Sequence, residues 1–503
     1  MTQSSASASK RDQRPWILAA LMFTIMLAAM DATIVSTAIP QIAGDLGGFS
    51  LFSWVFSIYL LAQTVTIPLY GKLADLYGRK PILIYGMVVF LIGSAACSLS
   101  WDMIALIFFR AIQGIGAGAI MATVNTIAGD IYTIEERAKI QGWLSSVWGM
   151  AAIAGPSLGG FFAEYSTWRW IFLINLPIGI LALILIVIFF KEKVVRRPHH
   201  LDISGAIMML ITGSVMMYTL IEGGSKWEWI STRGVSMVML SIILISITVM
   251  IEVRSKEPIM SIWVWRNKTM LGANLAMIGM GAVLLGPNMY LPVFSQAVKG
   301  LGAIAAGFIL SSSSIGWPVA SSLSGRLYLK IGFRNTAMIG AMGIVILSFS
   351  FTLLTFDSSP WFLVVQQVLL GASFGLLSTP SLVGVQSIVP WEKRGVVTGA
   401  NMFSRFLGQS MGAAILGGVF NSKMNAILSQ APTELNAEIP LVNDVIDVLQ
   451  SGESSVEIAN FLQQAFYDST HQVYFVMMCI GIFTFLVLFL QPKKFPVLEN
   501  KER

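Results

Sequence analysis

Apolar runs long enough to cross a membrane recur from one end of the chain to the other, separated by short polar segments. A run of about 18 or more apolar residues with few charges is the usual signature of a transmembrane helix. The sequence therefore predicts an all-α integral membrane protein with fourteen transmembrane helices. The predicted spans are residues 16–39, 51–70, 82–100, 103–128, 142–163, 169–190, 203–222, 234–252, 269–291, 302–324, 335–355, 361–383, 397–420 and 472–491.

Composition agrees with this class. The 503 residues are 55% hydrophobic and 12% charged, which is about half the charged fraction of a soluble domain. The net charge of +6 does not indicate a nucleic-acid partner, because the basic residues are scattered among the segments between spans. Two cysteines lie in apolar runs and form no metal or disulfide pattern. The first run follows basic residues as a signal peptide would, but it is about 24 residues long and contains Asp31, which favours a retained first helix.

The basic residues predict the orientation of the chain. If the N-terminus is cytoplasmic, 25 Lys and Arg residues fall on inner segments, five on outer segments, and two, Arg110 and Arg405, within spans. An even number of spans puts both termini on one side. We therefore expect a multi-pass protein of a bacterial-type cytoplasmic membrane with both termini in the cytoplasm.

One outer segment, 421–471, is long and acidic. It contains seven Asp or Glu residues and one Lys. Its stretch "SSVEIANFLQQAF" has apolar residues at helical spacing. This pattern predicts an amphipathic helix lying on the outer face, in preference to a substrate gate.

The two halves of the chain contain similar motifs at corresponding positions. "GKLADLYGRK" (71–80) follows the second span and "GRLYLKIGFR" (325–334) follows the tenth. An offset of 257 residues also aligns Glu135 with Glu392 and Arg137 with Arg394. Two parallel six-helix repeats are the plan of a rocking transporter. The predicted units are a tail 1–15, a six-helix bundle 16–190, an inserted helix pair 203–252, a second bundle 269–491 and a tail 492–503.

Five motifs occur in order along the spans. They are "MDATIVSTAIP" in the first span, "GKLADLYGRK" after the second, "RAIQGIGAG" in the fourth, "GPSLGG" in the fifth and "WRWIFLINLPIG" opening the sixth. With them the chain resembles the major facilitator superfamily, in particular the fourteen-helix drug:proton antiporter branch of the EmrB/QacA type. The resemblance implies that fold and proton-coupled export, and it says little about the substrate.

Asp31 is the first candidate for proton coupling. A carboxylate near the bilayer centre costs at least about 2.5 kcal/mol, and such residues usually face a cavity or a partner. A group that loads and releases a proton at this depth is what coupling requires. Arg110 lies at a similar depth, roughly 10–14 Å below the outer surface at about 1.5 Å rise per residue, so an ion pair is expected. The alternatives are a static ion pair, or a packing carboxylate held by Thr33 or Ser36.

Two further sets of residues follow from the resemblance. In the family the arginine at position 110 is associated with proton transfer, and the loop after the second span is a latch that stabilises the outward-facing state. The candidates for this latch are Gly71, Asp75, Gly78, Arg79, Lys80 and Arg137. Asp75 is placed to meet a helix N-terminus or a base; the alternative is that the basic residues of the loop serve topology alone. Glu222, at the outer end of the seventh span, is either a proton-entry residue or an interfacial carboxylate near Lys226.

"GPSLGG" supplies the residues of the antiporter motif. They are Gly155, Pro156, Gly159 and Gly160. Proline removes a backbone donor and kinks a helix, and glycine allows close helix contact. The motif predicts a kinked, closely packed helix at the interface between the halves; in the family it occurs in exporters. The glycines of "GIGAGAI" (114–120) likewise favour helix packing over nucleotide binding.

The candidates for the substrate cavity are uncharged polar residues and one arginine. They are Gln63, Gln113, Asn125, Asn288, Asn401 and Arg405. The thirteenth span contains no acid, and its Asn401, Arg405 and Gln409 lie at i, i+4, i+8 on one helix face. That face lines either the cavity or a seam between helices. If it lines the cavity, a preference for cations alone is in doubt.

These predictions converge on a proton-coupled multidrug exporter of small amphipathic compounds, working by alternating access. No nucleotide site, metal cluster or catalytic triad is visible, so we expect neither an ATPase nor a membrane enzyme, and no cofactor. The expected partners are the lipid bilayer, the exported compounds and protons, with no nucleic acid, and the protein is expected to be a monomer. A dedicated exporter of one metabolite or peptide, a lipid flippase and a non-transporting sensor are the alternatives.

Overall fold

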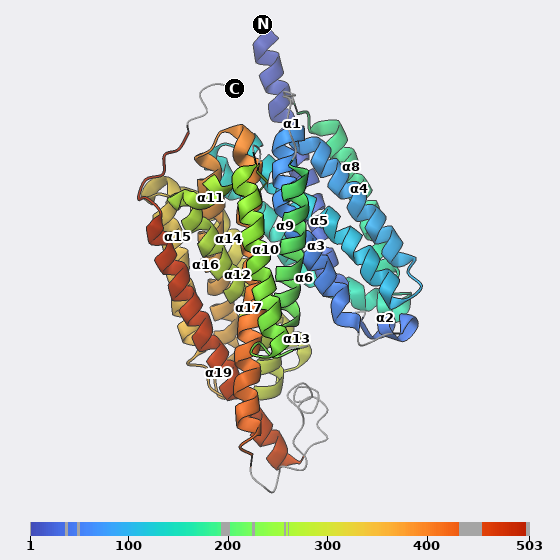
Figure 1. Cartoon of the computed structure of the whole chain (residues 1–503), viewed down its shortest axis with the longest axis vertical. Coiled ribbons are helices and arrows are strands. Elements are labelled where there is room, and N and C mark those ends of the chain that lie inside the picture. Colours follow the sequence, from blue (N-terminus) through green and yellow to red (C-terminus); the bar gives the residue numbers. More distant parts are fainter. Residues whose placement is uncertain are drawn as a thin grey trace.

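The computed structural model describes residues 2–35, 39–47, 51–192, 202–223, 227–255, 258–259, 261–431 and 455–498. Within these ranges the chain is helical, and its one β-bridge joins Gly223 to Trp227. The helices run along the long axis of the molecule, and the first and last of them bring the two termini to the same end (Figure 1). We call this the inner end, following the distribution of basic residues. Ser36 and Lys226 lie outside the described residues.

The first half contains six long helices or helix pairs. They are α1 (Thr2–Ile34), α3 (Phe52–Tyr77), α4 (Arg79–Ser98), α5 (Met103–Ile131), α6 (Ile134–Tyr165), and α7 (Trp170–Leu173) followed by α8 (Asn175–Phe189), with the short α2 (Ile39–Leu46) after α1. Capping residues in the sequence mark where some of these helices begin. The carboxylate of Asp102 accepts a hydrogen bond of 2.6 Å from the backbone of Ala105 and caps α5. Thr133 and Glu136 form a capping box at the start of α6.

The second half repeats this order after an inserted pair. The pair is α9 (Ile203–Glu222) and α10 (Thr232–Arg254), followed by the short α11 (Ile262–Arg266). The second half is α12 (Lys268–Val293) with a π-turn to Val298, α13 (Ala303–Ser311) with α14 (Ser313–Ile331), α15 (Phe333–Phe351), α16 (Pro360–Ser387), a 3₁₀ turn Trp391–Lys393 with α17 (Arg394–Leu428), and α19 (Val456–Val487). Gly78 and Gly332 have φ of 100° and 89° and make equivalent turns in the two halves.

The number of spans is supported in part. Twelve helices within the described ranges are long and apolar enough to cross a membrane. The predicted spans 142–163 and 397–420 correspond to α6 and α17, which have 32 and 35 residues but are not among the twelve. Both helices carry many small and polar residues where they pack between the halves. The count of fourteen therefore stays a prediction.

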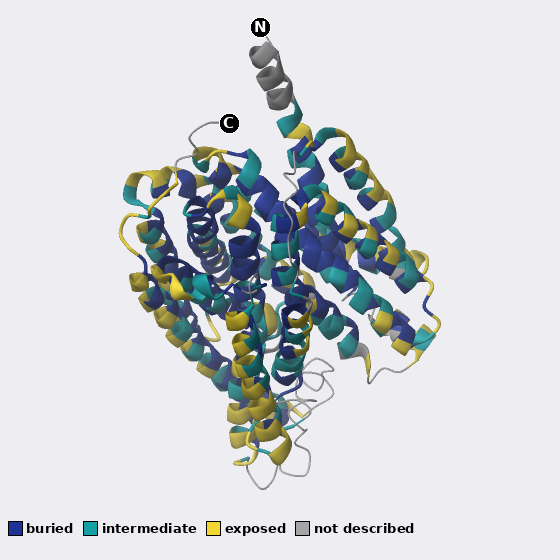
Figure 2. Cartoon of the chain, turned by 45° about the horizontal axis from the view of Figure 1, so that its top comes forward, coloured by how far each residue is buried: buried dark blue, intermediate teal, exposed yellow. Residues whose placement is uncertain are grey.

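Two seams join the halves, and each is made by a pair of helices that the repeat makes equivalent. In one seam α3 packs on α17, and in the other α14 packs on α6. Small residues allow this approach: a Cβ on Gly71 would lie 2.5 Å from the carbonyl oxygen of Gly395, and one on Gly325 would lie 2.7 Å from Cβ of Ala138. Large apolar clusters fill the interior of each half, and exposed residues lie mainly on the outer surface of the bundle (Figure 2).

The inserted pair covers one of these seams. α9 packs against both α3 and α17, and α10 packs on α9. α10 exposes large apolar side chains such as Met239, Ile242 and Ile243, as a lipid-facing helix does.

The acidic segment differs from its prediction. Residues 456–466 are helical, but they form the outer part of α19 and continue into the last span without a break. Ile458, Leu462 and Phe466 are buried against the second half. The apolar spacing thus belongs to a packed extension of a spanning helix, so the prediction of a separate helix lying on the outer face is wrong. Residues 432–454 lie outside the described ranges.

Candidate functional site

The carboxylate of Asp31 is enclosed by three polar side chains in the first half. Asp31 on α1 and Arg110 on α5 are both fully buried, and their carboxylate and guanidinium lie 2.5 Å apart. Gln113 Nε2 donates to the second carboxylate oxygen at 2.8 Å, and Asn175 Nδ2 donates to the same oxygen at 3.2 Å. Three helices therefore contribute side chains to this network: α1, α5 and α8, which begins at Asn175.

Groups around this network hold the arginine in place. Arg110 Nε donates to the carbonyl of Val55 at 3.2 Å, and its guanidinium carbon lies 4.3 Å from the ring centre of Tyr59. One nitrogen of Arg110 and the amide oxygen of Asn175 are buried without a hydrogen-bond partner among the described residues. The network thus retains one unused donor and one unused acceptor.

A proton bound by this network would bind to one member of a buried charge pair. A proton on Asp31 would remove the anion and leave Arg110 buried without a counter-charge. Breaking a buried ion pair by removing one partner typically costs about 3–5 kcal/mol. A conformational change that gives Arg110 another partner or access to water would relieve this cost. The geometry can therefore link protonation to the conformation of the bundle.

The sequence predicted part of this network. The predicted ion pair between Asp31 and Arg110 is confirmed. The hydroxyl of Thr33 donates to backbone carbonyls, including that of Ala151 at 2.9 Å, and is not a partner of Asp31. Gln113, a predicted cavity residue, belongs to the network instead. Asn175 was not predicted, although the isolated amide in the apolar stretch "IFLINLPIG" was the available signal.

Glu222 stands apart from this site. It is buried at the end of α9, and the contacts of Asp31 and Arg110 do not include it. A role for Glu222 in proton entry stays a prediction.

A second polar cluster closes the inner end between the halves. The carboxylate of Asp75, at the end of α3, accepts hydrogen bonds from the backbone nitrogens of Gly395 and Val396 at 2.9 and 2.8 Å. These nitrogens open α17, where free N–H groups and the helix dipole favour an anion. Arg79 bonds the same carboxylate at 2.8 Å. Asp75 thus meets both a helix N-terminus and a base, as predicted for its position.

Arg79 and Arg394 extend the cluster from opposite halves. Arg79 contacts Asp130 at 3.0 Å and the carbonyl of Trp391 at 2.6 Å, and its guanidinium lies 3.6 Å from the indole centre of Trp391. Arg394 contacts Asp130 at 3.1 Å. Asp130 was not singled out in the sequence; its position before the end of α5 was the available signal. We call Asp75, Arg79, Asp130 and Arg394 the inner charge cluster.

Two of the latch candidates lie elsewhere. Lys80 contacts only its own half among its described partners: its backbone nitrogen bonds Glu192 and its ammonium bonds the carbonyl of Val187 at 2.8 Å. Arg137 lies at the other seam, where its Nε bonds the carbonyl of Tyr132 at 3.1 Å. Burial, and secondarily repulsion by Arg394, lowers the pKa of Arg137 to about 10.

The antiporter motif lies in α6, and its first glycine faces its own half. A Cβ on Gly155 would collide with Thr33 of α1. Gly159 is buried, and a Cβ added to Gly160 would meet open space. α6 continues through Pro156, whose side chain is outside the described set. The expected contact with the opposite half is therefore wrong for Gly155; other α6 glycines, Gly142 and Gly149, face α14.

The cavity candidates do not gather around one space. Gln63 is buried where α3 meets α5, and Asn288 is exposed on α12. Asn125 lies between the halves, where its amide contacts Gln141 at 3.3 Å and its carbonyl accepts from Gln386 of α16. Asn401 is fully buried against α12, with Asn274 at 3.3 Å, so this part of the polar face of α17 lies in a seam.

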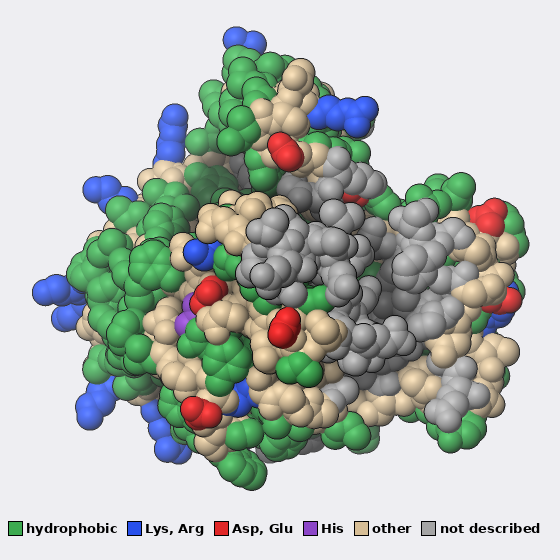
Figure 3. Space-filling model, turned by 90° about the horizontal axis from the view of Figure 1, so that it is seen from below, with side chains coloured by type: hydrophobic (Ala, Val, Ile, Leu, Met, Phe, Trp, Pro, Cys, Tyr) green, Lys and Arg blue, Asp and Glu red, His purple; other side chains and the backbone are tan. Residues whose placement is uncertain are grey.

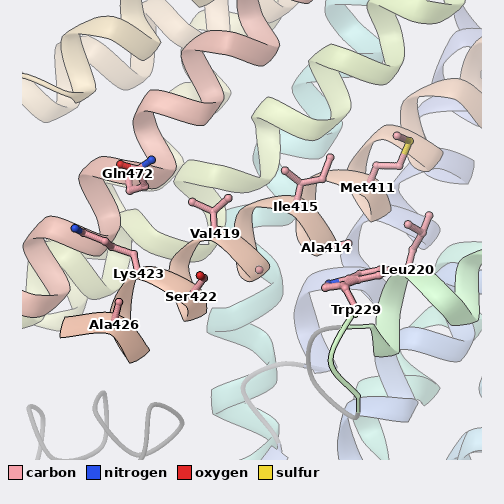
Figure 4. A pocket seen from close by; sticks show the side chains of 11 residues that line it. Leu220, Trp229, Met411, Ala414, Ile415, Val419, Ser422, Lys423, Ala426 and Gln472 are labelled. Carbon is pink, nitrogen blue, oxygen red and sulfur yellow. The ribbon is translucent and has the colours of Figure 1, made fainter. Parts of the chain in front are cut away.

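A cavity of about 800 Å³ lies toward the outer end, between the inserted pair and the second half. Leu220 and Trp229 line it on one side, and α17 lines it along a continuous face from Met411 to Ala426 (Figure 4). Lys423 and Gln472 provide its polar side. None of the predicted cavity residues lines it. Seen from this end, acidic and basic side chains of the described residues are scattered over the surface (Figure 3).

Comparison with known proteins identifies the family. A family model described as the Major Facilitator Superfamily matches residues 21–413. The chain belongs to the major facilitator superfamily. It is a membrane transporter and not an enzyme, as the sequence predicted, and its fold class is confirmed.

Curated relatives from this superfamily are similar over most of their length. Multidrug transporter protein MdtP of Bacillus subtilis is 31% identical over 98% of this chain and 95% of its own. Multidrug resistance protein 3 of the same organism is 34% identical over 84% of this chain and 83% of its own. The solved structures of human organic anion transporter MFSD10 and the proton:xylose symporter XylE each have a TM-score of 0.60, with 13% and 14% identity, over 95% of this chain and 99% and 97% of theirs. This likeness concerns the fold alone.

Proposed function

We propose that this transporter is a multidrug exporter that exchanges protons moving inward for amphipathic compounds moving outward across a bacterial cytoplasmic membrane. The observation that carries the proton coupling is the buried carboxylate of Asp31, held at 2.5 Å by Arg110 and by the amides of Gln113 and Asn175. The two multidrug relatives, similar over most of their length, support the class of substrate.

The inner charge cluster supports alternating access. Asp75 and Arg79 from the first half bond backbone groups of the second half, which closes the inner end. Rocking of α1–α8 against α12–α19 would open that end by breaking these bonds. Protonation of Asp31 would change the charge balance inside the first half during this motion. The antiporter motif and Glu222 are assigned supporting roles in packing and proton entry.

The test uses purified protein in proteoliposomes with an imposed pH gradient and a fluorescent amphipathic dye. Asp31→Asn keeps the size of the side chain and one acceptor oxygen, but it replaces the other oxygen with a donor and removes the charge and the proton site. We expect this variant to bind the dye and to lose gradient-driven accumulation, down to the level of protein-free liposomes. Competition between chemically unrelated dyes separates a multidrug pump from an exporter of one compound.

Asp45→Asn is the matched control. Asp45 on α2 is exposed and pairs with Arg169 at 2.7 Å at the outer end, so its loss should leave coupling intact. Normal uphill transport by Asp31→Asn would refute the proton site. Arg110→Ala should shift the pH dependence of dye binding, and an unchanged profile would count against competition between Arg110 and the proton.

A further inference from the structure

Arg405 is the second arginine within the predicted spans, and aromatic rings surround it. It lies on α17, and its guanidinium carbon is 5.2 Å from the ring centre of Trp317 and 5.7 Å from that of Phe406. The ring centre of Trp148 is 5.9 Å away. Trp317 belongs to α14 of the second half and Trp148 to α6 of the first half. Arg405 therefore points into the seam between the halves, whereas Asn401 on the same helix points into α12.

This arginine has no counter-charge in the part of the chain that the structure describes. Arg110 has a carboxylate at 2.5 Å and an amide oxygen at 2.9 Å, but Arg405 has neither a hydrogen bond nor an ion pair among the described residues. Its Nε is buried without an acceptor, while part of the residue stays accessible. An unpaired charge at membrane depth is costly, and such residues typically serve a substrate or ion pathway. The missing partner is an anion.

We propose that Arg405, with Trp148 and Trp317, binds the carboxylate of an aromatic, amphipathic organic anion as it is exported. The guanidinium offers a planar fork of donors that matches a carboxylate with two hydrogen bonds. The indoles offer flat faces on which the aromatic part of the ligand stacks. This assignment rests on the proposed function, because it names one substrate class of the exporter.

Two other ligands fit this place less well. A cationic compound would use the aromatic rings, but Arg405 already occupies them and would repel it. The phosphate of a lipid headgroup would also accept from the guanidinium, but acyl chains gain little from two indoles. An aromatic carboxylate would accept hydrogen bonds from the guanidinium and stack on the indole rings.

The site also lies between the two halves, which move relative to each other in alternating access. Gly149, next to Trp148, packs against Ser314 of α14, and Gly316, next to Trp317, packs against the backbone of Val368. The two indoles are thus held by closely packed backbone on either side of the seam. A ligand between them would contact both halves at once and lose one of its two faces when the halves rock apart.

The experiment compares a fluorescent aromatic carboxylic acid with its methyl ester. Binding is measured by fluorescence anisotropy with purified full-length protein in detergent, so that it does not depend on transport. We expect Arg405→Gln to raise the Kd for the acid at least about tenfold, because hydrogen bonds to a charged group are lost, with the Kd for the ester changed less than twofold. Arg405→Lys should restore binding of the acid only in part, since an ammonium does not form the planar pair.

Arg334→Gln is the matched control. Arg334 also lies over an aromatic ring, with its guanidinium carbon 5.3 Å from the centre of Phe489, but at the inner end of α15. It should leave both Kd values unchanged. An equal loss for acid and ester in Arg405→Gln would make the residue structural and overturn the proposal.

Two further arms separate the remaining ligands. A higher affinity of Arg405→Gln for an aromatic cation such as a quaternary dye would show that Arg405 occupies a cation site, and would overturn the proposal. Displacement of the acid by phosphatidylglycerol in mixed micelles, with no displacement by phosphatidylcholine, would assign the arginine to a headgroup instead. If wild type binds the acid through Arg405 but no gradient drives its transport, the site stands and the proposed function fails.

Discussion

The two inner seams occupy equivalent places in the repeat but are held by different chemistry. In the α3–α17 seam, charged groups meet: Asp75 bonds the start of α17, and Arg79 reaches the carbonyl of Trp391 at 2.6 Å. In the α14–α6 seam, the hydroxyl of Tyr328 donates to the carbonyl of Ile134. Trp391 and Ile134 are equivalent at the offset of 257 residues. The cross-half hydrogen bond is thus kept in both seams, although its donor has changed.

Uncharged residues stand at the second seam in the positions equivalent to Asp75 and Arg79. The offset of 254 residues between the two loop motifs puts Phe333 in the place of Arg79 and Leu329 in the place of Asp75. The ring of Tyr328 stacks on that of Phe333, with 4.6 Å between the ring centres. The ring of Phe333 packs in turn against that of Phe495 in the C-terminal segment, with 5.3 Å between the centres. Geometry was retained and charge was not. Because an opened ion cluster leaves unpaired charges, the α3–α17 seam should distinguish open from closed states more strongly than the aromatic seam does.

Asp75→Asn should have the largest effect on the difference between the two seams, because it weakens the α3–α17 seam alone. It removes an anion that a helix N-terminus and Arg79 both bind, at a cost of about 3 kcal/mol to the closed inner end. Spin labels on the inner ends of the two halves should report a shift toward longer distances. Lys80→Gln, whose described contacts stay in the first half, should keep the wild-type distance distribution. An unchanged distribution in Asp75→Asn would mean that the charges do not hold this seam.

Arg394 and Arg137 are equivalent residues that should respond in opposite ways. Arg394 bonds Asp130 at 3.1 Å, so Arg394→Gln should destabilise the protein by about 2 kcal/mol. Arg137 bonds a backbone carbonyl and has no ion pair among the described residues, although each of the two arginines has one buried nitrogen without a partner there. Arg137→Gln should therefore change stability by less than about 0.5 kcal/mol or increase it. Thermal unfolding in detergent measures both, and equal losses would contradict the difference between the seams.

The pH dependence of stability gives a further test of the role of Arg137. The pKa of Arg137 is lowered from 12.5 to about 10 by burial and by Arg394, so its charged form is disfavoured in the folded protein. That penalty to folding is fully present below a pH of about 10. It is lost as the pH rises from there toward the pKa of the arginine in the unfolded chain. The stability of Arg137→Gln relative to wild type should therefore fall over that interval, because wild type regains the stability that the charge costs it. A constant difference would show that the charge of Arg137 is not the cause.

Tyr328→Phe should have the smallest effect. It removes the hydroxyl that bonds Ile134 but keeps the ring stack with Phe333. A single neutral hydrogen bond contributes about 1 kcal/mol, so the inner end should stay mostly closed in the spin-label measurement. An opening as large as that of Asp75→Asn would show that the hydroxyl, and not the stack, holds the second seam.

The prediction of the site succeeded where depth along a helix was enough. Helical rise alone put Asp31 and Arg110 at one level of the bilayer, and the two residues pair. It failed where rotation about the helix axis decided the outcome. Asn401 and Arg405 lie on one face by spacing, but Asn401 is buried against α12 and Arg405 faces the tryptophans of α6 and α14. One helix face can border two neighbours, and residue spacing does not say where one neighbour ends.

The partners of the charged residues were equally beyond the sequence. Asn175 and Asp130 join their clusters from helices that are distant along the chain, and Gly155 packs on α1 instead of the opposite half. Lipid is as apolar as a helix interior, so hydrophobicity does not mark which face of a span meets which helix. Close packing of small residues makes that choice, and it depends on both surfaces together.

The sequence by itself determined the helical membrane class, the repeat and the pairing of two buried charges. These properties follow from local composition, from periodicity and from the fixed rise of a helix. The tertiary structure alone decided that one seam is closed by charges and the other by aromatic rings, and that Arg405 has no anionic partner among the described residues. Both depend on which helices become neighbours and how each is rotated, and packing between helices sets these over the whole bundle.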